Sequence, residues 1–108
     1  MTDSASNQEQ NRLKVKKICQ AMVENKMSYI MGSRLILSFA RGAGFHTDDP
    51  DILIIVGIES ETDHIPSQSE LAHWNRQAMA EQKDDWAGFE KWAQEVGKEA
   101  CLNLISRL

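Results

Sequence analysis

The chain has 108 residues, 42% of them apolar and 26% charged, and these values are ordinary for one globular domain. Its most apolar run, residues 52–58, is far shorter than the ~18 residues that a membrane-spanning helix needs. The polar N-terminal stretch lacks the basic and apolar segments of a signal peptide. We therefore expect a flexible tail over residues 1–8, a single domain over residues 9–108 and no membrane partner.

The net charge of −4 is unevenly distributed. Residues 1–41 carry +4 and residues 42–108 carry −8, and the stretch from Asp48 to Asp63 holds six acids and no Lys or Arg. A nucleic-acid surface would need the opposite sign, so we expect no nucleic-acid partner. The acidic part favours a basic partner or a cation. The alternative is that the two oppositely charged segments pack beside each other and largely cancel.

Two helices are predicted in the first half of the chain. Residues 9–24 have apolar side chains at helical spacing with lysines between them, and Asn25 can end this helix in a left-handed conformation. A second helix is predicted over residues 28–41, with Ser28 as its N-cap. Gly32 lies inside it at a cost of about 1 kcal/mol against Ala, which predicts the close approach of another helix. A glycine-containing loop follows.

Residues 51–58 could form a buried strand or a helix. The Ile and Val content favours a strand, but Asp49 is a suitable N-cap and Pro50 suits the first helical position. No other segment offers a strand partner for the backbone hydrogen bonds. We therefore predict a helix that ends near Glu61.

A long last helix is predicted over residues 76–106, with Asn75 as its N-cap and one short turn before it. Trp86 and Trp92 lie on its apolar stripe and are interpreted as core or subunit-interface residues. At 1.5 Å per residue the helix would span about 46 Å, so it either breaks near residues 84–88 or projects and contacts a second subunit. The expected fold class is all-α, a compact bundle of four to five helices with a long C-terminal helix; a homodimer through that helix is one alternative.

The order of short motifs along the chain resembles a group of small bacterial cytosolic proteins of unknown function. The motifs are MGSRLI, DDPD, VGIESETDHIP, HWN, KDD and KEACLNLI, and the resemblance covers about residues 15–106. It implies a single cytosolic domain and no particular reaction, cofactor or catalytic residue. Cys19 and Cys101 are expected to be free buried thiols, which also fits a reducing cytoplasm.

No motif predicts catalysis or a cofactor. The chain has no GxSxG elbow, no phosphate-binding glycine loop and no HExxH or CxxC pair. One alternative is a metal-binding protein or metal-dependent hydrolase that uses Glu59, Asp63 and His64 as ligands. These acids could instead face water or pair with Arg34, which lies among apolar neighbours and needs a partner.

The leading hypothesis is a small acidic cytosolic module that binds another protein, as inhibitors and immunity-type proteins do, by docking a basic partner surface. Because Glu59 and Asp63 share one helical face, we expect them to form a structural ion pair with Arg34. Glu61, Asp48 and Asp51 are then the acids that we expect on the outside, in contact with the partner. The candidate partner-binding residues as a set are Asp48, Asp51, Glu59, Glu61 and Asp63.

Overall fold

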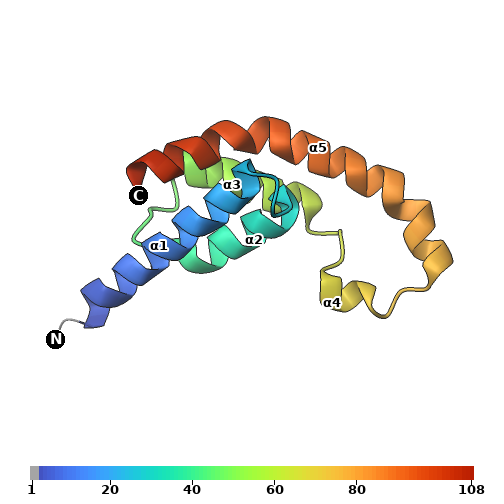
Figure 1. Cartoon of the computed structure of the whole chain (residues 1–108), viewed down its shortest axis with the longest axis horizontal. Coiled ribbons are helices and arrows are strands. Elements are labelled where there is room, and N and C mark those ends of the chain that lie inside the picture. Colours follow the sequence, from blue (N-terminus) through green and yellow to red (C-terminus); the bar gives the residue numbers. More distant parts are fainter. Residues whose placement is uncertain (1–2) are drawn as a thin grey trace.

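The computed structural model describes residues 3–108, and the side chains of residues 7–67 and 70–108. The described chain forms four long helices and one single-turn helix, without strands, which confirms the all-α prediction (Figure 1). No helix within these residues is both long and apolar enough to cross a membrane. The helices are α1 (Asp3–Val23), α2 (Tyr29–Ala40), α3 (Pro50–Thr62), α4 (Gln68–Leu71) and α5 (Arg76–Arg107).

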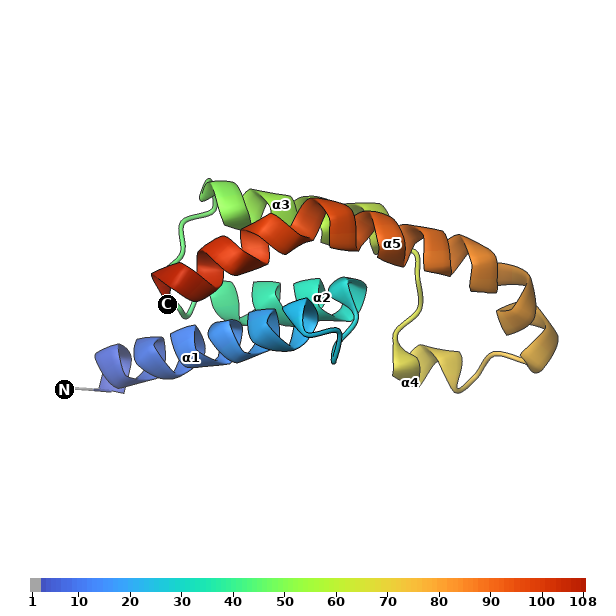
Figure 2. The same cartoon turned by 45° about the horizontal axis from the view of Figure 1, so that its top comes forward.

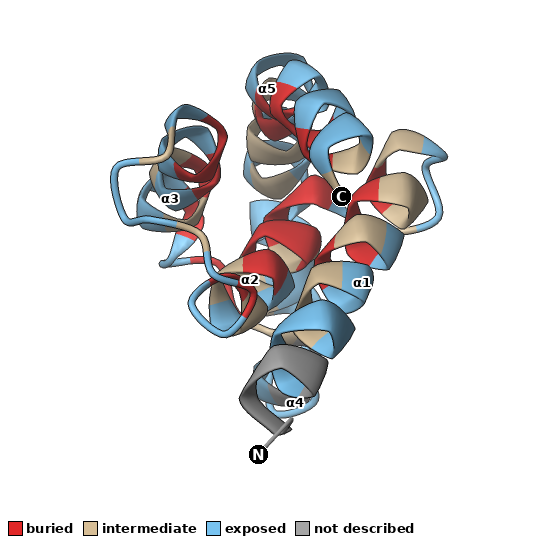
Figure 3. Ribbon diagram, turned by 90° about the vertical axis from the view of Figure 1, so that its left-hand side faces the viewer, coloured by how far each residue is buried: buried red, intermediate tan, exposed pale blue. Residues whose placement is uncertain are grey.

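The four long helices enclose one core. Helices α1 and α3 lie on either side of α2, and α5 runs across all three (Figure 2). Buried surfaces turn inward, toward the space between the helices (Figure 3). The largest fully buried apolar side chains are those of Val15, Met22, Ile36, Ile55, Ile58 and Leu104.

Helix α1 begins at Asp3, inside the stretch predicted to be a flexible tail. Its first turns have partners in the loop after α2, because the Gln8 side chain donates a hydrogen bond to the Ala43 carbonyl and Asn11 lies against Gly42. The structure thus has helix over residues 3–8, where a tail was expected; the flexibility of this segment stays a prediction, and residues 1–2 lie outside the described chain. Asn25 has a φ of 60°, which confirms the predicted left-handed end of this helix.

The start of α2 is capped twice. Ser28 is its N-cap, as predicted, and accepts hydrogen bonds from the amides of Ile30 and Met31. The Glu90 carboxylate of α5 also reaches this terminus: it accepts from the Ser28 hydroxyl at 2.6 Å and from the Tyr29 amide at 2.7 Å. A carboxylate at a helix N-terminus satisfies free amides and meets the positive end of the helix dipole. Glu90 therefore fixes the middle of α5 to α2.

Helix α3 occupies the segment that could have been a strand, so the helix prediction is confirmed. The Asp49 side chain accepts hydrogen bonds from the amides of Asp51 and Ile52, and Pro50 occupies the first turn. Both features favour a helix start regardless of the apolar residues that follow.

Helix α5 is continuous, and its beginning projects beyond the bundle (Figure 1). Its buried residues all fall between Ala93 and Leu104, whereas none of residues 76–92 is buried, although Trp86 and Phe89 pack against the edge of the core. The Cα radius of gyration is 15.0 Å, against about 13 Å for a compact chain of this size. Of the two predicted outcomes, the projecting helix is therefore correct and the break is wrong. Dimerisation through it stays a prediction.

Three helical glycines differ in what surrounds them. A Cβ on Gly32 would lie 2.3 Å from the Met22 sulfur, which confirms the predicted close approach of another helix. A Cβ on Gly97 would lie 2.8 Å from Ile58 Cδ1. A Cβ on Gly57 would meet no atom within 4 Å, so no contact inside the chain explains a glycine there.

The variants Gly57→Ala and Gly97→Ala should shift stability in opposite directions. Alanine at 57 should raise the free energy of unfolding by ~0.5–1 kcal/mol, because a helix interior favours Ala over Gly. Alanine at 97 should lower it by ~1–3 kcal/mol, because the core there has no room for a methyl group. Urea unfolding followed by circular dichroism measures both. A Gly57→Ala chain no more stable than wild type would contradict the open surroundings of this residue.

Candidate functional site

The outward side of α3 is apolar and exposed. Ile52, Ile55 and Ile58 face the core and are at most 4% exposed, whereas Leu53 is 50% and Ile54 39% exposed. Figure 3 shows α3 with buried residues on its inner side and exposed ones on its outer side. Helices that are apolar on every side are normally covered on every side. In this chain only the inner side of α3 is covered.

Helix geometry places the exposed residues together. Positions 53, 57 and 60 recur at spacings of four and three, and position 54 lies beside them on the same side of the helix. Val56, 37% exposed, flanks this side next to α2. We call Leu53, Ile54, Val56 and Gly57 the outward face of α3.

Asp51 fixes how α3 is rotated about its own axis. Its carboxylate accepts hydrogen bonds from Arg107 Nη1 at 2.8 Å and from the Asn103 amide at 3.1 Å, both on α5. The Asp51 residue is 9% exposed. The Asp51 side chain is therefore held by α5, which leaves little of it for the predicted partner contact. Sequence reasoning missed Arg107, which lies 56 residues away along the chain.

The same arginine also binds the N-cap of α3. Arg107 donates to both carboxylate oxygens of Asp49, and its guanidinium lies 5.3 Å from the centroid of the Phe45 ring. The hydrogen bond from Arg107 is the main reason that the pKa of Asp49 falls to about 2 from an ordinary 3.8, with the helix amides contributing further. The pair likewise raises the pKa of Arg107. This end of the bundle is thus closed by two carboxylates, one guanidinium and one aromatic ring.

The remaining predicted acids separate into two groups. Asp48 is exposed beside the start of α3, whereas Glu61 and Asp63 are exposed at its end, and Glu59 is half-buried. The two ends are about 20 Å apart along the helix axis. The acids therefore flank the outward face of α3 rather than forming one continuous patch.

Arg34 does not form the predicted ion pair. Its guanidinium donates to the carbonyls of Thr62 at 2.7 Å and Ile65 at 2.6 Å, and no ion pair joins it to Glu59 or Asp63 in the described residues. The last carbonyls of a helix lack partners within the helix and carry its negative dipole end. Arg34 therefore caps the end of α3, and the two acids stay outside this contact.

The alternative metal ligands do not converge. No group of three or more His, Cys, Asp or Glu side chains placed to hold a metal occurs within the described part of the chain. The His64 ring packs edge-on against Phe89 of α5, with 5.0 Å between ring centroids. Glu59 and Asp63 lie on the same side of α3 as Val56, and Val56 borders α2. His64 thus packs on α5, whereas Glu59 and Asp63 share another side of α3.

The two cysteines are fully buried and unbridged, as predicted. A hydrogen bond with Cys101, together with burial, raises the pKa of the Cys19 thiol. A protonated buried thiol is a poor nucleophile. The same hydrogen bond lowers the pKa of the Cys101 thiol, and both residues lie fully buried between α1 and α5.

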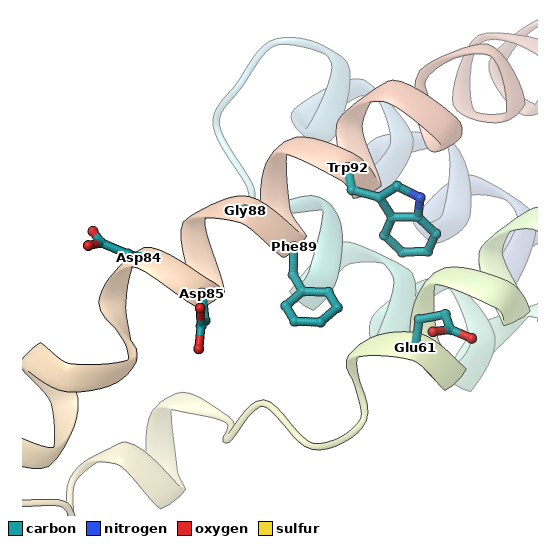
Figure 4. Close-up of a pocket in the computed structure, with 6 residues that line it drawn as sticks. All are labelled: Glu61, Asp84, Asp85, Gly88, Phe89 and Trp92. Atoms are coloured by element: carbon teal, nitrogen blue, oxygen red, sulfur yellow. The ribbon is translucent and has the colours of Figure 1, made fainter.

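A groove of about 510 Å³ lies between α5 and the end of α3. The side chains of Asp85, Phe89 and Trp92 lie on the side of α5 that faces the end of α3 and the segment after it, with Asp85 and Glu61 at opposite ends of the groove, as Figure 4 shows. Sequence reasoning placed Trp92 in the core or a subunit interface, and it assigned no role to Asp85 or Phe89. The available signal was the spacing of four and three between positions 85, 89 and 92, which puts an acid and two aromatic rings on one side of the helix.

No protein-family model matches the chain, and neither the curated proteins nor the solved structures contain a match.

Replacing Arg107 with Gln should make stability depend on pH in a defined way. The pKa of Asp49 is lower in the folded chain than in the unfolded chain, so the pair stabilises the fold above about pH 4 and loses this effect as the pH falls from about 4 to about 2. Because the Arg107 side chain is 41% exposed, water screens the pair, and we expect a loss of ~1–2 kcal/mol at pH 7. The difference from wild type should shrink below pH 4.

Urea unfolding at several pH values measures this difference. Arg76→Gln, at the exposed start of α5, is the matched control and should leave stability within ~0.5 kcal/mol of wild type. A constant difference between wild type and Arg107→Gln from pH 7 to pH 2.5 would contradict the role given to Asp49.

Proposed function

We propose that this protein is a binding module that docks another protein through the outward face of α3 and the acids at its two ends. The partner surface is apolar at its centre and rich in Lys and Arg around it. Occupation of a basic cleft, as by small inhibitors and immunity-type proteins, is the form of binding that this surface suits best. No catalytic constellation is needed for such a role.

The single observation that carries the proposal is the exposed apolar side of α3. Leu53, Ile54 and Val56 are all more than a third exposed and lie within four consecutive positions of one helix. Protein interfaces commonly have an apolar centre and a polar rim. Isolated exposed apolar residues need no explanation, but here Leu53 lies at the centre of the outward face with Ile54 and Val56 on its two flanks, and such a neighbouring group is typical of an interaction site. Gly57, unexplained by any internal contact, would let a partner approach the helix backbone closely.

The charge at the ends of α3 supports a basic partner. Asp48, Glu61 and Asp63 are exposed, and within the described chain none of them forms an ion pair or a side-chain hydrogen bond. Such charges increase the rate of encounter with an oppositely charged surface and penalise acidic competitors. Asp51, which belonged to the predicted set, is left out of this surface because Arg107 occupies it.

We place the module in the cytoplasm. Cys19 and Cys101 remain unbridged although they share a hydrogen bond in the core. Free thiol pairs of this kind are usual in a reducing compartment. The resemblance to small cytosolic bacterial proteins agrees with this location.

Capture by the immobilised protein from a lysate of its source cells tests the proposal. The double variant Leu53→Lys/Asp63→Lys should reduce recovery of the partner at least tenfold, because it removes apolar contact and places positive charge against a basic surface. The matched control, Leu102→Lys/Glu99→Lys, makes the same changes on the exposed side of α5 and should capture normally. Circular dichroism verifies that both variants fold.

Several outcomes would contradict the proposal. The double variant could capture the partner as well as wild type does. The captured protein could be acidic. Its recovery could also be the same at high and low salt, whereas a contact between exposed charges should weaken above physiological ionic strength because salt screens it. The captured species could also be a second copy of this chain, in which case the homodimer alternative would replace the proposed function.

A further inference from the structure

The groove between α5 and the end of α3 has aromatic walls with carboxylates beside them. Phe89 and Trp92 turn their rings into the space between the helices, with Asp85 on one side and Glu61 on the other (Figure 4). At about 510 Å³, the groove has room for a long side chain and part of the segment that bears it.

Among the described residues, no cation pairs with the carboxylates of the groove. The described ion pairs involve only Glu24, Asp49 and Asp51, so Glu61, Asp84 and Asp85 lack one, and none of these three accepts a side-chain hydrogen bond. A cation that enters the groove gains attraction from the carboxylates and from the faces of the aromatic rings.

At the opposite end of the bundle, an arginine of this chain binds a similar combination of two carboxylates and an aromatic ring. There the guanidinium of Arg107 binds Asp49 and Asp51 and lies over the Phe45 ring at 5.3 Å. The groove holds two carboxylates and aromatic rings as well, but the chain supplies no arginine to it. A guanidinium suits this chemistry better than an ammonium, because its flat face stacks on rings while its edge donates to carboxylates.

We propose that the groove binds an arginine side chain of the protein partner, stacked on Phe89 and Trp92, with the Glu61 and Asp85 carboxylates at the two ends of the groove as counter-charges to the guanidinium. This inference rests on the proposed function, because it names the residue that the partner inserts. It also extends the contact surface from α3 to α5, which sequence reasoning had not assigned to partner binding. Glu61 is one of the acids at the end of α3 and also lines the groove, so it connects the two parts of the contact surface.

Fluorescence polarisation with a labelled hexapeptide of alternating Arg and Gly tests the groove directly. Two matched hexapeptides carry lysine or the neutral arginine analogue citrulline in place of arginine. Wild type should bind the arginine peptide at least tenfold more tightly than the citrulline peptide and severalfold more tightly than the lysine peptide. Equal affinity for the arginine peptide and either of the others would overturn the assignment.

Two variants locate the binding. Glu61→Gln/Asp85→Asn removes charge at exposed positions and should weaken binding of the arginine peptide at least tenfold. Asp84→Asn is the control, because Asp84 borders the groove but its carboxylate points away from the rings (Figure 4), and it should change affinity less than twofold. Unchanged binding by the double variant, or an equal loss in the control, would overturn the proposal.

The variant Leu53→Lys/Asp63→Lys separates this inference from the proposed function. The groove proposal predicts that it still prefers the arginine peptide to the citrulline peptide, because its changes lie outside the groove. If wild type shows no such preference while its capture of a basic protein still depends on Leu53, the groove proposal fails and the proposed function stands. If the arginine preference is present but capture is independent of Leu53, the proposed function fails instead.

Discussion

The contact of Arg107 with Asp49 and Asp51 is the constraint on which the arrangement of α3 depends. Helix α3 has apolar residues on every side, so burial of apolar area alone would not select one rotation about its axis. Asp51 selects it, because a nearly buried carboxylate must face its guanidinium partner. Ile52, Ile55 and Ile58 then turn to the core, and Leu53 and Ile54 turn to water. The exposed apolar face thus follows from an ion pair at the beginning of the helix.

Helix α5 combines two tasks along its length. Its second half closes the core, with Glu90 at its middle holding the start of α2 and Arg107 at its end holding the start of α3. Its beginning projects, and the aromatic residues that follow are only partly buried at the edge of the core: Trp86 contacts Trp74, and Phe89 contacts His64. The groove forms where the two halves meet. A rigid helix anchored at two points can hold such a surface in a fixed position relative to α3.

Much of the fold could be predicted from local signals. Asp49 and Pro50 identified the start of α3 because capping acts within a few residues, and Ser28, Asn25 and Asn75 acted likewise. The candidate site could be predicted only in part. Six acids between Asp48 and Asp63 indicated an acidic region, but their individual roles depend on Arg107 and Arg34, whose partners are distant in sequence. Charge pairing across the bundle cannot be read from spacing along one helix.

Photo-crosslinking from the outward face of α3 tests the central claim most directly. A benzophenone-bearing residue replaces Leu53 in one protein and Leu102, which is exposed on α5, in a control, and both are irradiated in a lysate of the source cells. Our account predicts that position 53 alone yields a covalent adduct with one basic protein, which mass spectrometry identifies. No adduct from position 53, the same adducts from both positions, or an adduct only with a second copy of the chain would contradict it.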